Sequence, residues 1–258
     1  SAGRVQSPTL AMIVQREEEI RNFKPKPYYT INAKTKGYSL AWVNKDNNSR
    51  IFDEEFANKI LSKIKGAEGE VVNVNSTNKK KFSPALYDLT ELQRDANKMF
   101  GYSAKETLSI MQKLYEHHKV LTYPRTDSRY LTDDIVDTLK DRIKAVNTSE
   151  YSKVCMKLLK TKIKPNKSFV DNSKVTDHHA IIPTEERVFL GDLSDKERKI
   201  YDLVVKRFLS VLCPPFEYEQ TTIKGSCEGE TFTAKGNKII KLGWRENYTA
   251  DDDETYDG

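Results

Sequence analysis

The sequence has 258 residues, of which 37% are hydrophobic and 31% charged, with a formal net charge of +5 and a pI near 8.8. This length allows one large domain or two small ones with cores of their own. No stretch approaches the roughly 18–20 apolar residues of a membrane span, and no signal peptide opens the chain, so we expect a cytoplasmic protein without membrane insertion. The mild excess of basic residues favours a polyanionic partner such as nucleic acid.

The three cysteines are odd in number and widely spaced, at Cys155, Cys213 and Cys227. They form neither a C-x-x-C pair for zinc nor a disulfide framework. We expect reduced thiols.

The first third of the chain alternates between helix and strand patterns. A rough apolar stripe predicts a helix over 7–22, and alternating residues predict strands within 28–43. A second helix is expected from the capping residue Asp53 to Gly66, followed by a strand over 70–76.

The middle of the chain is helical in pattern and carries several helix-capping signals. Ser103 and Ser194 are each followed three residues later by glutamate, which is the spacing of a capping box. Thr90 and Thr132 are simpler candidates for N-cap residues. After Pro215, three strand patterns joined by glycine turns follow, at 217–225, 230–236 and 238–244.

Strand patterns therefore flank a helical block over about 84–215. We predict the α+β class, with a helical domain inserted into a β-rich domain.

The segment "LTYPRTDSRYL" places Tyr123 two residues before Arg125. A tyrosine hydroxyl, with a pKa near 10, is a poor nucleophile unless nearby groups offset the charge that builds on a phosphate. The planar fork of Arg125 suits phosphate oxygens, and Thr126, Asp127 and Ser128 form a polar cluster. An ordinary helix end with a half-buried tyrosine remains the alternative.

The segment "HHAIIPT" places two adjacent histidines, His178 and His179, before an apolar run. Adjacent side chains point to different sides of an extended or helical backbone, so both are not expected to bind one metal. A histidine that donates to a phosphate or shuttles a proton is the functional interpretation. Two polar loop histidines are the alternative.

The opening "SAGRVQSPT" places Arg4, Gln6 and Ser7 just ahead of a predicted helix, whose N-terminal amides favour an anion. An exposed polar helix entry explains the same residues.

A run of lysines over 79–81 precedes Phe82. Such runs are usually solvated surface, although they also contact backbone phosphates.

Taken together, these segments resemble type IA DNA topoisomerases. "SAGRVQSPTL", "SPALYDLTELQRDANKMFGYSAKETLSIMQKLYE", "LTYPRTDSRYL" and "HHAIIPT" follow one another in that family's order and approximate spacing. The resemblance covers essentially the whole chain, and it is closest to the bacterial topoisomerase III branch.

The resemblance implies a toroid with a β-rich arch and a helical domain that carries the tyrosine. On this basis we expect an N-terminal helix of the base domain at 1–25, a β-rich arch domain at 26–83 and 216–258, and the helical domain at 84–215.

The resemblance also implies roles for individual residues. Tyr123 would become linked to the 5′-phosphate of a cut single strand, Arg125 would place and neutralise that phosphate, and His178 matches the functional histidine of the family. The DNA-binding residues that we expect are Arg4, Gln6, Ser7, Thr126, Asp127, Ser128, Arg129 and His179.

An acidic metal-binding domain normally precedes "SAGRVQS" in this family, and the chain shows no counterpart; the "DDDE" at 251–254 lacks its strand context. We therefore expect Mg²⁺ in the full-length enzyme and no metal bound by this chain. The chain resembles a central fragment, expected to be inactive alone but to bind single-stranded DNA weakly. The resemblance further implies a nucleoid-associated monomer and a helicase as a cellular partner.

Two other function classes remain open. Relaxases and tyrosine recombinases also use a tyrosine on DNA, although relaxases alternate their histidines with apolar residues and recombinases place the tyrosine after their histidines. A non-enzymatic module that binds single-stranded nucleic acid is the other alternative.

Overall fold

The computed structural model describes residues 3–148 and 150–248, in two compact units that are treated separately below. The first unit holds the described residues up to Thr77 together with Gln220–Asn237. The second holds Asn78–Glu219 and the described residues from Lys238 onward. The domain boundaries expected at 84 and 215 stay predictions, and the acidic run at 251–254 lies outside the described residues.

The first unit begins with helix α1 (Gln6–Arg21), which buries none of its residues. Strands β1 (Asn32–Lys34) and β2 (Ser39–Val43) follow, and then helix α2 (Glu54–Ile64). The Asp53 carboxylate accepts hydrogen bonds from the first turn of α2, so the predicted N-cap is confirmed.

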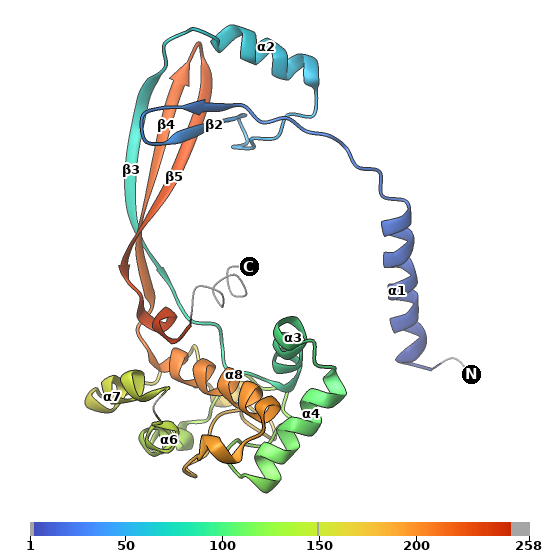
Figure 1. The fold of residues 1–258 in the computed structure, drawn as a ribbon, viewed down its shortest axis with the longest axis vertical. Helices are drawn as coiled ribbons and strands as arrows, with labels where there is room; N and C mark the ends of the chain where they lie inside the picture. Colours follow the sequence, from blue (N-terminus) through green and yellow to red (C-terminus); the bar gives the residue numbers. More distant parts are fainter. Residues whose placement is uncertain (1–2, 149, 249–258) are drawn as a thin grey trace. The chain divides into compact units, whose positions relative to one another are not determined.

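One five-stranded sheet, in the order β1-β2-β5-β4-β3, gathers strands from both sides of the helical block (Figure 1). β2 pairs antiparallel with β5, as expected if a helical segment interrupts one β-rich region. The other strands are β3 (Glu70–Lys81), β4 (Phe216–Cys227) and β5 (Glu230–Lys241).

The predicted glycine turn at Gly236 is wrong, because β5 runs through it without a break. The turn predicted between 225 and 230 is confirmed at Glu228 and Gly229, which both have positive φ, as a tight antiparallel hairpin requires. A glycine inside a strand does not end it when the ladder continues on both sides.

The core of the first unit forms where α2 packs on the sheet. It consists of Ile31, Leu40, Trp42, Ile51, Ala57, Ile60 and Phe232.

The second unit is mainly helical, and its longest helix is α8 (Asp195–Leu212), half of which is buried (Figure 1). Helices α3 (Leu89–Phe100), α4 (Ala104–Gln112), α6 (Leu139–Val146) and α7 (Ser152–Lys160) accompany it. The short elements are the π-helix η1 (Lys113–His117), α5 (Asp133–Val136), η2 (Asn172–Lys174), η3 (Leu190–Asp192) and η4 (Gly243–Asn247).

Of the four caps predicted in this helical unit, those at Ser103 and Ser194 are confirmed by side-chain bonds. Thr90 does not cap α3. Asp88 does, because its carboxylate is the group that reaches the amide of Glu91. Thr132 occupies the N-cap position of α5 without a side-chain bond.

The structure is thus a mixture of helices and an antiparallel sheet, which agrees with the predicted class. Among the described residues, no helix has the length and apolar character needed to cross a membrane.

Candidate active site

The tyrosine and double-histidine motifs lie side by side in the helical unit. The amide of Thr122 donates to the carbonyl of Ile182 over 3.0 Å, and the Ile182 amide donates to Thr122 Oγ1 over the same distance. Two residues away in each segment, the amide of Thr184 donates to the Val120 carbonyl. This short pairing brings together two segments that are more than fifty residues apart in sequence.

The pairing places His178 against Tyr123. Their ring centroids are 4.2 Å apart, with 37° between the ring planes. The ring of Tyr115, from the π-helix η1, meets Tyr123 in an edge arrangement at 5.5 Å. Tyr123 is half-buried whereas His178 is exposed, so the tyrosine is fixed between two rings while one side stays open to a ligand.

A hollow of about 560 Å³ opens beside the tyrosine, within the range of roughly 300–1,000 Å³ typical of small-ligand sites. Tyr115, Glu116, Lys119 and Thr184 are among the residues that line it. A phosphodiester can therefore reach Tyr123.

Exposure alternates along the loop that follows the tyrosine. Arg125 and Asp127 are exposed, whereas Thr126 and Ser128 are buried. Thr126 Oγ1 donates to the carbonyl of His178 over 2.9 Å and accepts from the amide of Ser128. Thr126 thus ties the two motifs together, and Arg125 is left free to reach outward.

Ser128 and Arg129 also bond to the backbone. The Ser128 hydroxyl donates to the Lys174 carbonyl over 2.8 Å, and Arg129 Nε donates to the Leu86 carbonyl over 3.0 Å. These contacts favour a role in holding the loop for three of the four polar residues expected to bind DNA after Arg125.

His179 turns the other way from His178. Its Nδ1 lies 2.7 Å from the carbonyl oxygen of Ala180, and burial lowers its pKa below the ordinary histidine value. Of the two adjacent histidines, His178 is the one that faces Tyr123.

The remaining predicted residues, Arg4, Gln6 and Ser7, belong to the first unit. All three are exposed at the start of α1, and the N-cap position is held by Val5 without a side-chain bond. The structure therefore brings together Tyr123, His178 and Thr126, and it places the N-terminal group in a different compact unit.

Comparison with known families shows which family the chain belongs to. A family model described as DNA topoisomerase matches residues 1–257. The chain belongs to the DNA topoisomerase family.

Individual topoisomerases agree with this assignment. The chain is 58% identical over 261 residues to DNA topoisomerase 3 of Bacillus cereus and 53% identical over 260 residues to that of Bacillus subtilis, covering 100% of this chain in both cases. It spans about a third (36%) of the length of these curated relatives. Its fold matches the full-length topoisomerase I of Thermotoga maritima with a TM-score of 0.70 and 29% identity, over 97% of this chain and 40% of that one. The resemblance to type IA topoisomerases is confirmed.

The topoisomerase resemblance also implies Mg²⁺, and the described residues do not fit such a site. Among them, no group of three or more histidine, cysteine, aspartate or glutamate side chains is placed to hold a metal ion.

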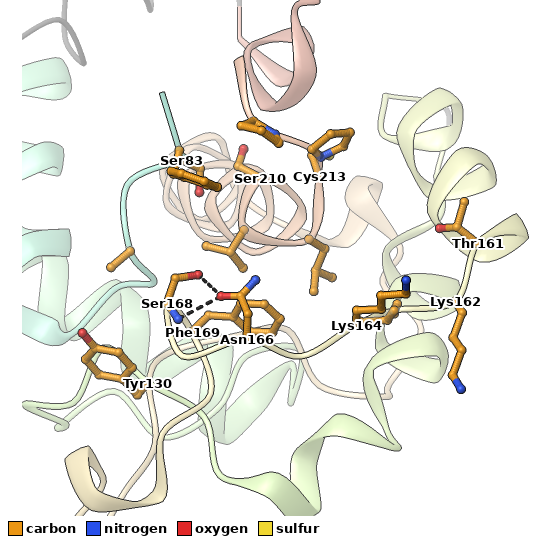
Figure 2. A pocket seen from close by; sticks show the side chains of 17 residues that line it. Ser83, Tyr130, Thr161, Lys162, Lys164, Asn166, Ser168, Phe169, Ser210 and Cys213 are labelled. Atoms are coloured by element: carbon orange, nitrogen blue, oxygen red, sulfur yellow. Dashed lines mark hydrogen bonds between the residues drawn. The ribbon is translucent and has the colours of Figure 1, made fainter. Parts of the chain in front are cut away.

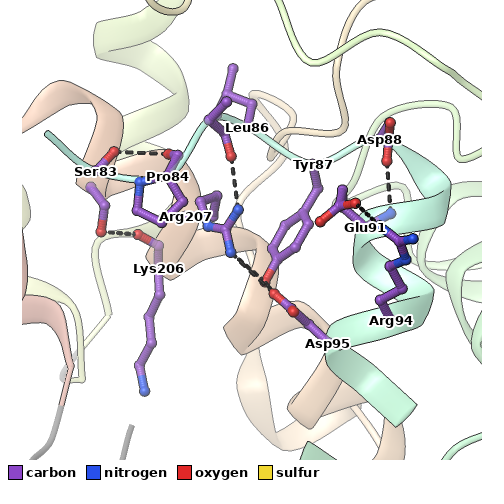
Figure 3. Close-up of polar contacts among 12 residues, drawn as sticks. Ser83, Pro84, Leu86, Tyr87, Asp88, Glu91, Arg94, Asp95, Lys206 and Arg207 are labelled. Carbon is purple, nitrogen blue, oxygen red and sulfur yellow. Dashed lines mark hydrogen bonds and ion pairs between the residues drawn. The ribbon is translucent and has the colours of Figure 1, made fainter. Parts of the chain in front are cut away.

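Sequence reasoning missed a buried polar network beside the candidate site (Figure 3). Arg207 of α8 contacts Asp95 over 3.1 Å, and its Nη1 donates to the Ala85 carbonyl over 2.8 Å. The Tyr87 hydroxyl donates to the same carboxylate over 2.5 Å. The Tyr87 carbonyl in turn accepts from the amide of Ile181 in the histidine motif. No local sequence pattern predicts this network, because its members come from three separate segments of the chain.

The bond from Thr126 to His178 can be tested with Thr126→Val, which keeps the shape but leaves the His178 carbonyl without this donor. We expect a loss of about 1–3 kcal/mol in the free energy of unfolding of the helical unit, together with weaker Tyr123–His178 ring contacts. Denaturant titration and NMR would measure the two effects. Thr90→Val, at an exposed position, is the control, and an equal effect from both variants would contradict the assignment.

His179 should make the helical unit less stable in acid. Its pKa is lower in the folded state than in the unfolded chain, so between these two values the unfolded chain binds more protons. This contribution is complete above a pH of about 6.5 and is lost as the pH falls toward the folded-state pKa. Unfolding midpoints from pH 7.5 to 5 should show a shallower pH dependence for His179→Gln than for wild type. An unchanged slope in His179→Gln would count against this account.

Proposed function

We propose that this chain carries the strand-cleaving centre of a type IA topoisomerase, which cuts, passes and rejoins single-stranded DNA without ATP. The observation that supports it best is the contact between Tyr123 and His178, because it unites the two motifs of the family resemblance in one open site.

In the proposed reaction, the Tyr123 oxygen attacks the phosphorus of a phosphodiester. The bond from phosphorus to the 3′ oxygen breaks, the tyrosine becomes esterified to the 5′-phosphate, and the proton of the tyrosine ends on the released 3′-hydroxyl. One ester replaces another, so the reverse attack reseals the strand without ATP. His178, beside the ring, is placed to donate to the phosphate, and the exposed Arg125 to neutralise its charge.

The finer architecture is part of the same proposal. The β-rich unit would be the arch, the helical unit the movable part that carries Tyr123, and α1 a piece of the base domain. The exposed apolar side chains of α1, which include Leu10, Ile13 and Ile20, support this last assignment, because a helix usually buries such a face. We propose that carboxylates outside this chain hold Mg²⁺. A monomeric state, a nucleoid location and a helicase partner rest on the resemblance alone.

Covalent trapping tests this function. A chain of the relatives' full length is mixed with a single-stranded oligonucleotide labelled at its 5′ or 3′ end and stopped with detergent. We expect the 3′-labelled piece to stay attached to protein and the 5′-labelled piece to be released, while the 258-residue chain alone forms no adduct. Retention of the 5′-labelled piece would indicate a recombinase-like 3′ linkage, and no adduct in the longer chain would favour a binding module.

A further inference from the structure

A second hollow in the helical unit shares no lining residue with the one beside Tyr123. Its volume is about 640 Å³, which lies within the range of roughly 300–1,000 Å³ for small-ligand sites. In Figure 2, Ser83 and Tyr130 lie on one side of it, while Lys162 and Lys164 lie on the other. Its floor is apolar where Phe169 is buried. The function proposed above uses none of these residues.

The lysine side of this hollow belongs to a strongly basic segment. Residues 152–167 include six lysines and no aspartate or glutamate. Two of the six are partnered, since Lys153 and Lys157 lie 4.0 and 2.8 Å from the carboxylate of Glu246. Lys160, Lys162 and Lys164 are exposed and form no ion pair within the described part of the chain, while Lys167 interacts electrostatically with the Asp171 carboxylate. Like charges gathered in one short segment repel one another in the free protein, and an incoming polyanion relieves that repulsion.

An exposed aromatic ring also lines the hollow. Phe82 is 69% exposed and lines the hollow directly after the lysine run at 79–81. Tyr130, half-buried, adds a second ring and holds Lys174 over its face at 4.6 Å. Aromatic rings next to lysines are the arrangement on which proteins stack the bases of single strands.

Backbone contacts fix the walls of the hollow. The amide of Trp244 donates to the Pro214 carbonyl over 3.0 Å. Gly243 has a φ of +55° there, and a Cβ on it would come within 2.3 Å of the Pro215 carbonyl oxygen. On the opposite side, Asn166 Oδ1 accepts from the amide of Ser168 over 2.8 Å (Figure 2). Because these walls are already fixed in the free protein, less conformational entropy is lost when a ligand binds.

We propose that this hollow binds one nucleotide unit of a single-stranded nucleic acid, with phosphates on Lys162 and Lys164 and a base against Phe82. A base can stack on the exposed Phe82 ring only if it is unpaired, and the bases of a duplex are paired and stacked on one another. The lysines without an ion-pair partner favour a polyanion as the ligand. The exposed ring and the apolar floor favour a nucleotide over an acidic peptide. The hollow would bind the strand at a position separate from Tyr123. This binding would not require cleavage of the strand.

Fluorescence anisotropy of the 258-residue chain with a labelled twelve-residue thymidine oligonucleotide tests the proposal across a salt series. Lys162→Glu combined with Lys164→Glu should weaken binding at least about tenfold at low salt. It should also make the slope of log affinity against log salt shallower by about 1.4, since each lost phosphate contact on a single strand accounts for about 0.7. Phe82→Ala should weaken binding about tenfold with no change in slope.

The matched control reverses the charge of two exposed lysines elsewhere in the helical unit, with Lys105→Glu combined with Lys140→Glu. A loss of affinity and slope equal to that of the Lys162 and Lys164 pair would overturn the proposal, as would full binding by Phe82→Ala. Equally tight binding of labelled polyglutamate, lost in the same variants, would replace the nucleotide with an acidic protein segment. Because no step requires an adduct, failure of the trapping experiment above would leave this result unaffected.

Discussion

Replacing Tyr123 by phenylalanine, in a chain of the relatives' full length, is expected to abolish covalent trapping and relaxation of supercoiled DNA. Phenylalanine lacks the attacking oxygen, and removal of a covalent nucleophile costs on the order of 10⁶-fold in rate. The ring contacts with His178 and Tyr115 do not need the hydroxyl. Folding and DNA binding should therefore stay near wild type, and only the chemistry should be lost.

Tyr115→Phe is the matched control, because Tyr115 presents the nearest other tyrosine ring. It should keep activity within a few-fold of wild type, since we assign it a packing role and no chemical one. The opposite outcome, with Tyr123→Phe active and Tyr115→Phe inactive, would move the nucleophile to the π-helix η1.

Arg207→Ala should cause the largest loss of stability. Arg207 and Asp95 form a largely buried ion pair, with side chains 4% and 19% exposed. Removing one partner leaves the other charge without compensation, which costs about 3–5 kcal/mol. The Ala85 carbonyl also loses a donor, beside the segment on which the histidine motif pairs. Denaturant unfolding would measure this loss through Trp244 fluorescence in a Trp42→Phe background, so that the signal reports only the helical unit.

The exposed pair between Arg94 and Glu91 provides the control for this prediction. Arg94 is 71% exposed, and such pairs contribute roughly 0–1 kcal/mol, so Arg94→Ala should change little. Arg207→Met combined with Asp95→Leu should lose less than Arg207→Ala, because no buried charge is then left without its partner. A loss below about 1 kcal/mol for Arg207→Ala would contradict the role of the network.

Local chemistry made much of the fold predictable. The caps at Asp53, Ser103 and Ser194 were readable because each depends on a side chain and an amide only a few residues away. Thr90 failed for the same reason, since Asp88 competes for the same helix start and its carboxylate is the better acceptor. The break expected at Gly236 failed because strand pairing, which is not local, carries β5 through that position.

For the candidate site, the sequence could suggest residues but not the contacts between them. The resemblance could name Tyr123 and His178, but adjacent histidines look alike in sequence until the pairing with Thr122 decides which one faces the tyrosine. The buried position of Thr126 also depends on that pairing. Arg207 meets Asp95 and Ala85 through the packing of segments that are distant in sequence, so no spacing rule signals it.

The most direct test identifies the residue that carries the DNA. The trapped adduct is digested with nuclease and then with trypsin, which cleaves after Lys119 and Arg125 to release a short peptide over 120–125 that contains Tyr123. Mass spectrometry should find the phosphate-linked nucleotide on this peptide. The peptide over 114–119, which carries Tyr115, should be unmodified. A nucleotide on Tyr115, or on any peptide other than 120–125, would contradict the account.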